Sequence, residues 1–154
     1  MRVEIDESDR IILRAIQSDR RLGLEVLADD CGLSVPSVQR RLKRLRESGI
    51  IQREVAILDS SRLDYAMTFI VLVELERESL VKLDQFRKQM KAEPQVQQCY
   101  YVTGEADFIL ICTARDMQDF EALTHRLFFE DSNVRRFRTS VSMDRTKVGL
   151  TVPI

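Results

Sequence analysis

The sequence of 154 residues has few of the residues from which metal sites and disulfide frameworks are built. It has one histidine, His125, and three widely spaced cysteines, Cys31, Cys99 and Cys112, without a CxxC pair. Neither a disulfide framework nor a zinc site is expected, and such cysteines are typical of small buried side chains. With one histidine the chain also offers no set of nucleophile, base and orienting acid. We predict no catalytic residue, no metal and no cofactor.

Glycine-rich loops and long apolar runs are also missing. The five glycines are scattered and form no phosphate-binding loop. The longest wholly apolar run, residues 69–73, is far shorter than the ~20 residues that cross a bilayer. The first twenty residues contain many charged side chains and no apolar central region, so no secretory signal is predicted. We expect a cytoplasmic protein that has no membrane among its partners.

Positive charge is concentrated in one short segment, although the whole chain carries a formal net charge of −1. Residues 34–54 contain six basic residues against two acidic ones, a net charge of +4. Local charge of this kind, rather than the overall balance, is what nucleic acid requires of a binding protein.

Helical spacing of apolar residues dominates the first sixty residues. Asp6 is suited to cap a first helix, a second apolar stripe ends at Gly32, and a third begins after Ser34 and ends at Gly49. Two helices joined by the short turn 32–34 predict a helix-turn-helix. The β-branched stretch 50–58 that follows predicts the extended wing of a winged helix-turn-helix.

Beyond the polar break at 59–61, strand and helix patterns alternate. We predict strands at 67–76, 96–103, 106–114 and 134–143, and helices at 79–91 and 117–129. The order βαββαβ is that of a ferredoxin-like domain. The expected fold is therefore α+β, with a winged helix-turn-helix over residues 1–60 and a ferredoxin-like domain over residues 61–154.

The strands of the second domain also predict an interface. The runs 69–73 and 108–112 are apolar on both faces, as the two central strands of such a sheet should be. Both helices of a βαββαβ fold cover the same face, so isoleucine and leucine side chains on the other face need a cover. A second copy of the same sheet is the simplest cover, and we predict a homodimer through this domain.

The third helix has the side chains that read DNA in a major groove. Glutamine pairs with adenine edges and arginine with guanine edges, while lysine and arginine reach phosphates. We therefore expect double-stranded DNA as a partner, although a solvated basic helix face would have the same composition. The candidate DNA-binding residues are Ser34, Ser37, Gln39, Arg40, Arg41, Lys43, Arg44 and Arg53.

The chain resembles the Lrp/AsnC, or feast/famine, family of transcription regulators over essentially its whole length. The motifs that carry the resemblance are the stretch 6–13, Leu27-Ala28, Gly32-Leu33-Ser34, the stretch 38–42 with Leu45, Gly49-Ile50-Ile51, the stretch 102–108 and the stretch 139–147. The resemblance implies dimers that assemble into octamers or similar discs and an amino acid or related metabolite as effector. Many members of the family have Gly where this chain has Asp64, and this departure bears on the geometry of the linker.

The resemblance also implies where the effector binds, near the turn between the second and third strands. Gly104 would let the backbone approach a ligand, and a carboxylate such as Asp107 would take an ammonium group. Structural roles remain open, because a tight hairpin also needs Gly104 and the helical stripe places Met117 in the core. The implied effector residues are Thr103, Gly104, Glu105, Asp107, Met117, Ser140 and Ser142.

Two alternative functions share features with this interpretation. Proteins similar to the family, with the same two domains, act as decarboxylases in tetrapyrrole synthesis, but the basic third helix favours DNA. The RNA-recognition module shares the βαββαβ order. It stacks bases on exposed aromatic residues among basic ones, which the central strands of this chain lack.

Overall fold

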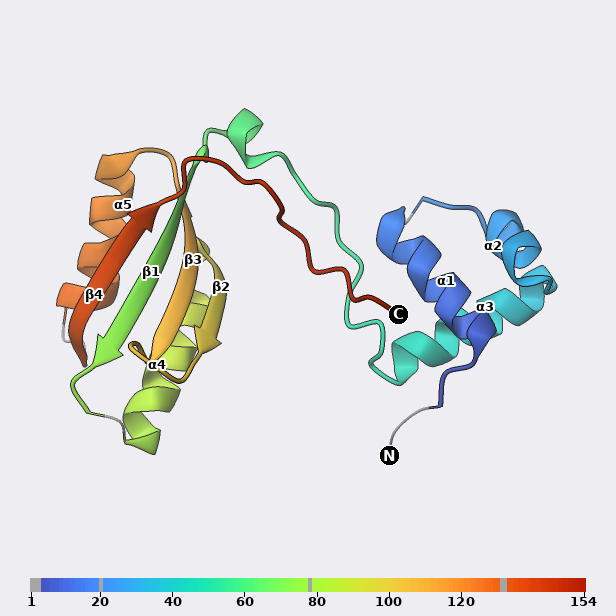
Figure 1. The fold of residues 1–154 in the computed structure, drawn as a ribbon, viewed down its shortest axis with the longest axis horizontal. Coiled ribbons are helices and arrows are strands. Elements are labelled where there is room, and N and C mark those ends of the chain that lie inside the picture. Colours follow the sequence, from blue (N-terminus) through green and yellow to red (C-terminus); the bar gives the residue numbers. More distant parts are fainter. Residues whose placement is uncertain (1–3, 20, 78, 131–132) are drawn as a thin grey trace. The chain divides into compact units, whose positions relative to one another are not determined.

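The computed structural model describes residues 4–19, 21–77, 79–130 and 133–154, which fold into two units (Figure 1). The first unit consists of Met1–Ile57 together with Val148–Ile154, and the second consists of Leu58–Lys147. The sequence division after residue 60 left the last seven residues with the second domain. In the structure these residues belong to the first unit instead.

The first unit contains the three predicted helices, α1 (Glu7–Ser18), α2 (Leu24–Cys31) and α3 (Val35–Glu47). The Asp6 side chain accepts a hydrogen bond from the Asp9 backbone and Asp9 reciprocates, which satisfies two orphan donors at the start of α1. Gly32 ends α2 in the left-handed conformation at φ 62°, where a Cβ would be strained. One core of apolar side chains joins the three helices, and its most deeply buried members are Ile12, Leu27, Val38 and Leu45. This arrangement confirms the predicted helix-turn-helix.

The stretch 50–58 differs from the wing strands predicted for it. Among the described residues none of its backbone joins a strand ladder, and Ile57 and Leu58 are exposed. β-branched residues favour an extended backbone, but a strand forms only where a second strand accepts its hydrogen bonds.

The last residues of the chain pack against α1. The Gln17 side chain donates to the Val152 carbonyl at 3.2 Å and accepts from the Val152 N–H at 2.8 Å. The Arg14 guanidinium donates to the Ile154 carbonyl, and Ile154 packs against the core of the first unit. Local periodicity gives no sign of such pairing, because it joins residues about 135 positions apart.

The second unit has the ferredoxin-like order that the sequence predicted. Its elements are β1 (Met67–Leu75), α4 (Leu80–Ala92), β2 (Val96–Tyr101), β3 (Phe108–Ala114), α5 (Met117–Thr124) and β4 (Val134–Val141), preceded by a 3-10 turn at Ser60–Leu63. The antiparallel sheet has the order β2-β3-β1-β4. A π-helical turn, His125–Phe129, extends α5. β2 and β3 are shorter than predicted, because residues 102–107 form the turn between them.

Helices α4 and α5 cover one face of the sheet (Figure 1). Phe69 of β1 stacks on Phe120 of α5 with ring centroids 3.7 Å apart, and Phe86 of α4 packs on Phe108 of β3 at 4.5 Å. The other face has an apolar centre, in which Ile70 pairs with Ile111. Ile70 is 37% exposed, and no helix among the described residues of this unit covers it.

Candidate nucleic-acid interface and ligand site

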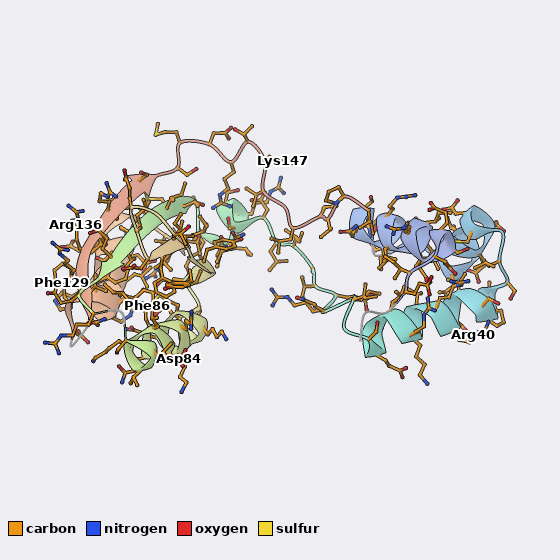
Figure 2. All side chains as sticks on the ribbon, turned by 60° about the horizontal axis from the view of Figure 1, so that its bottom comes forward. Arg40, Asp84, Phe86, Phe129, Arg136 and Lys147 are labelled. Carbon is orange, nitrogen blue, oxygen red and sulfur yellow. The ribbon has the colours of Figure 1, made fainter. Side chains whose placement is uncertain are left out.

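The exposed face of α3 presents the side chains that could contact DNA. Gln39, Arg40 and Lys43 are exposed on α3, and Arg40 has no hydrogen-bond or ion-pair partner among the described residues (Figure 2). Lys43 makes only an exposed pair with Glu47, at 3.7 Å one turn further on. Such a surface pair contributes little to stability, so Lys43 can exchange it for a phosphate.

Helix α3 begins after Ser34, whose hydroxyl donates to the Ser37 hydroxyl at 3.1 Å and accepts no capping hydrogen bond from a helix N–H. The Ser37 and Val38 N–H groups donate to the Ser34 carbonyl, so what the first turn of α3 offers an anionic DNA backbone is mainly the positive end of the helix dipole. Arg53 lies beyond α3 in the exposed stretch 50–58.

Two arginines of α3 are already used inside the unit. Asp9 is fully buried, and its carboxylate accepts from Arg41 at 2.9 Å and from Arg44. Arg41 also donates to the Asp6 carboxylate at 2.7 Å. The hydrogen bond from the Asp9 N–H and the contact with Arg41 hold the pKa of Asp6 below its usual value. These bonds give Arg41 and Arg44 a structural role, since they tie α3 to the start of α1.

Asp9 is the residue that sequence reasoning missed. Its place three residues after the cap Asp6 is the spacing of a capping box, a signal that could have singled it out. A buried carboxylate needs positive partners, and the arginine-rich third helix was the available source.

The turn between β2 and β3 holds four of the predicted effector residues. Gly104 adopts φ 125°, a conformation that L side chains rarely adopt, and Thr103, Gly104 and Glu105 are exposed. The Asp107 carboxylate instead accepts the Leu75 N–H at 2.6 Å, and the Asp107 N–H donates to the Val73 carbonyl. Asp107 therefore anchors the turn to the end of β1, although a carboxylate still has room to accept from a ligand.

Two of the other three predicted effector residues, Met117 and Ser142, lie at the opposite end of the same sheet. Val73 pairs with Phe108 beside the turn, whereas Phe69 pairs with Val141, next to Ser140 and Ser142. The length of β3 separates the two ends, about 20 Å for a strand of this length. Met117 follows β3 at the far end and is 55% exposed, so the core position indicated by its helical stripe is wrong. Ser140 lies nearer to the turn, two residues from Arg138, which donates to the Glu105 carboxylate at 3.2 Å, so one chain leaves only Met117 and Ser142 at the far end.

No other cluster suggests catalysis or metal binding in the part of the chain that the structure describes. It holds no group of three or more His, Cys, Asp or Glu side chains that could bind a metal. His125 pairs with Glu130 on the surface at 3.3 Å. Burial raises the pKa of the Cys112 thiol to about 12, so this thiol is uncharged at neutral pH. None of the described helices has the length and apolar character needed to span a bilayer.

Comparisons with known proteins match both units. Residues 68–152 match the Lrp/AsnC ligand binding domain and residues 5–52 match a winged helix-turn-helix DNA-binding domain. An uncharacterised HTH-type transcriptional regulator of Sinorhizobium fredii is 45% identical over 99% of this chain and 90% of its own length. The leucine-responsive regulatory protein of Rhizobium meliloti is 32% identical over 100% of this chain and 99% of its own.

Solved structures show the same likeness. An AsnC family transcriptional regulator from Agrobacterium tumefaciens has a TM-score of 0.90 at 28% identity, covering 97% of both chains. A transcriptional regulator from Neisseria meningitidis, solved as an L-Met complex, has a TM-score of 0.90 at 25% identity and also covers 97% of both chains. These matches give no support to the decarboxylase alternative.

Proposed function

The chain belongs to the Lrp/AsnC family of DNA-binding transcriptional regulators, and from this premise we propose which of its residues contact DNA and where its effector binds. Gln39, Arg40 and Lys43 contact the DNA from the exposed face of α3. The observation that carries this assignment is the division of the basic residues of α3. Arg41 and Arg44 donate to the buried Asp9 carboxylate, whereas Lys43 makes only an exposed pair with Glu47 and Arg40 has no ion-pair partner among the described residues.

The roles of these side chains follow from their chemistry. Gln39 and Arg40 reach base edges, and Lys43 neutralises a phosphate. Ser34 and Ser37, at the start of α3, contact the DNA backbone. Arg53, beyond the end of the helix, does the same. Arg41 and Arg44 act indirectly, because they orient the helix that carries the reading side chains.

The effector of this proposal is an amino acid or a similar small metabolite bound at the turn 102–107. A relative solved with L-Met supports the ligand class. The exposure of Thr103, Gly104 and Glu105 supports the place, and the ion pair formed there, between Glu105 and Arg138 at 3.2 Å, lies on the surface. Because Met117 and Ser142 lie about 20 Å from the turn in the same chain, a complete site that uses both groups requires a second chain.

Self-association completes the proposal. The open face of the sheet, centred on Ile70, Leu72, Ile109 and Ile111, is the surface of a homodimer, and dimers assemble further into an octamer or a similar ring. Two copies of α3 then meet a two-fold related DNA site. The protein works on DNA in the cytoplasm and has no catalytic role.

DNA contact is tested with a labelled duplex from upstream of the protein's own gene, by fluorescence anisotropy over a salt series. We expect Arg40→Ala to weaken binding by about 1–3 kcal/mol and Lys43→Ala to lower the salt slope by about 1. Arg44→Ala is unsuitable because it also removes one of the two arginine partners of the buried Asp9. Lys88→Ala, on the exposed side of α4, is the matched control. Equal affinity of Arg40→Ala, Lys43→Ala and Lys88→Ala would contradict the assignment.

Effector coupling is tested by sedimentation velocity and DNA affinity with each proteinogenic L-amino acid in turn. Only a ligand that binds one assembly state better than another can shift the equilibrium. We expect at least one amino acid to change both the mass of the assembly and the DNA affinity. Unchanged mass and affinity across the whole set would count against the effector role.

A further inference from the structure

The chain passes between its two units twice. It crosses first between Ile57 and Leu58, before it forms the sheet, and again between Lys147 and Val148, when it returns to the first unit. Lys147 is labelled on the returning segment in Figure 2. The first unit, which carries the DNA-reading helix α3, is therefore attached to the second unit by two connections rather than one.

The two connections end on different helices of the first unit. The first leads away from α3, where Arg46 donates to the Glu54 carboxylate at 3.2 and 3.1 Å. The second docks on α1, where the Gln17 side chain exchanges hydrogen bonds of 3.2 and 2.8 Å with the backbone of Val152. A body held at one point can swivel about that point, whereas attachment through two helices removes most of this rotation.

In the second unit the two connections start from one place and are short. Arg145 of the returning segment donates to the Ser60 hydroxyl of the outgoing segment at 2.6 Å. Seven residues along the chain lead from Arg145 to Val152, and six lead from Glu54 to Ser60. Because an extended chain spans at most ~3.6 Å per residue, the connections reach at most ~25 Å and ~22 Å. Neither of them contains a long loop that would let the first unit turn freely.

The docked segment also acts on α3 through α1. The Arg14 guanidinium of α1 donates to the Ile154 carbonyl, and Ile154 packs against the core of the first unit. At the other end of α1 the buried Asp9 accepts from Arg41 and Arg44 of α3. Helices α1 and α3 therefore move as one body, and a restraint on α1 is also a restraint on the direction of α3.

We propose that segment 144–154 is a strap that restricts the orientation of the DNA-reading unit, and that Gln17 and Arg14 are positioning residues for DNA binding. The strap itself does not contact DNA. It determines which spacing of two half-sites an assembly can bind, because each copy of α3 must reach its half-site from a restricted direction. This inference rests on the proposed function for the DNA contacts of α3 and for the homodimer.

The test lengthens the strap without undocking it. An insertion of about ten Gly and Ser residues between Lys147 and Val148 adds a flexible coil to the full-length protein. It leaves the contacts of Gln17 with Val152 in place. The matched control carries the same residues after Ile154, where they lengthen neither connection. Hydrogen exchange of α1 amides should be the same in both proteins, because the strap stays docked in both.

The spacing of half-sites is a readout that a purely structural role of the strap would not change. The probes are the labelled duplex from upstream of the protein's own gene and two derivatives of it. The derivatives are lengthened by about half a helical turn (~5 bp) or a whole turn (~10 bp) at the centre of the segment that the wild type protects from nuclease.

We expect the wild type and the control to lose about tenfold in affinity on the half-turn duplex and to recover on the whole-turn duplex. The insertion variant should lose about threefold or less on the half-turn duplex, because a unit on a slack strap turns to follow its half-site. An insertion variant that discriminates among the duplexes as sharply as the wild type would overturn the proposal. A wild type that binds the half-turn duplex as well as the original would also overturn it.

A measurement without DNA separates this proposal from the proposed function. A dye on Glu25→Cys, an exposed position of α2, reports the rotation of the first unit by time-resolved fluorescence anisotropy. The background carries Cys99→Ser, because Cys99 is exposed. We expect faster depolarisation on the nanosecond timescale in the insertion variant than in the wild type and the control.

Equal decays in the three proteins would overturn the strap, whatever the DNA measurements give. Equal affinity of the wild type and Arg40→Ala for the original duplex would instead contradict the DNA contacts of α3. That second outcome leaves the fluorescence result standing, so failure of the strap and failure of the proposed function are distinguishable.

Discussion

Asp9 shows how one carboxylate determines the placement of a DNA-reading helix. It is fully buried, and both of its oxygens accept from α3, one from Arg41 and one from Arg44. The arginines retain access to water, with side chains 23% and 46% exposed, whereas Asp9 has none. The pairing therefore depends on the burial of Asp9, and Arg41 and Arg44 keep α3 close to α1.

We expect Asp9→Asn to destabilise the protein by about 2–3 kcal/mol. This is below the cost of breaking a fully buried pair, because the two guanidinium groups can turn to water. Urea unfolding measures the change. Glu7→Gln is the matched control, since Glu7 makes an exposed pair with Arg14 at 3.2 Å and should contribute less than about 1 kcal/mol. A cost for Asp9→Asn no larger than the control would show that the cluster does not stabilise the unit.

Asp64 is a second residue whose backbone decides its effect. It adopts φ 62° and ψ 13°, in the left-handed region that residues other than glycine enter with strain. We expect Asp64→Gly to be more stable than Asp64→Ala by about 1 kcal/mol, because only glycine enters this region without strain. Thermal or urea unfolding of the two variants gives the difference.

The same pair of substitutions at Asp84 is the control for Asp64. Asp84 lies within α4, where alanine favours the helix over glycine by about 1 kcal/mol (Figure 2). The order of stability should therefore reverse between the two positions. An unchanged order would mean that the left-handed conformation of Asp64 does not control its stability.

At the scale of elements, the C-terminal segment acts as part of the first unit. The chain ends in a segment that α1 binds through Gln17 and Arg14. We expect truncation after Leu150 to lower the free energy of unfolding of the first unit by about 1–2 kcal/mol, from two or three exposed hydrogen bonds and the partial burial of Ile154. Hydrogen exchange of α1 amides and urea unfolding measure the loss.

A double-mutant cycle identifies the contact responsible. Gln17→Ala should destabilise the full-length protein but have almost no effect on the truncated one. Additive effects of the two changes would contradict the contact between Gln17 and Val152.

The strands and helices of the second unit were predicted with small errors at their ends, because each has its own apolar period. Alternate residues of β1 and β3 are buried, and α4 and α5 each have one apolar stripe. The stretch 50–58 has no apolar period of this kind. Its composition indicated an extended backbone but not a partner strand.

At the scale of the molecule, a single chain leaves one face of the sheet in the second unit uncovered. Tyr100, Ile109 and Leu72 lie across it in neighbouring strands, and Tyr100 is 48% exposed. We expect Ile70→Arg to break the proposed homodimer, because it would bury an unpaired charge in the apolar centre of the interface. Sedimentation velocity over a range of protein concentrations measures the change.

Val81→Arg provides the comparison, since Val81 is an exposed apolar residue of α4, on the covered side of the sheet. It should leave the mass of the assembly unchanged. If Ile70→Arg and Val81→Arg sediment alike, another surface makes the dimer.

The sequence by itself determined the helix-turn-helix, the βαββαβ order and the polar face of α3, because periodicity and capping act between near neighbours. Only the tertiary structure decided which polar groups remain available for function. Arg41 and Arg44 meet Asp9 across 32 and 35 residues, Asp107 meets Leu75 across 32, and Gln17 meets Val152 across 135. Such contacts depend on how the elements pack, and no local pattern encodes which of several arginines or aspartates will be used.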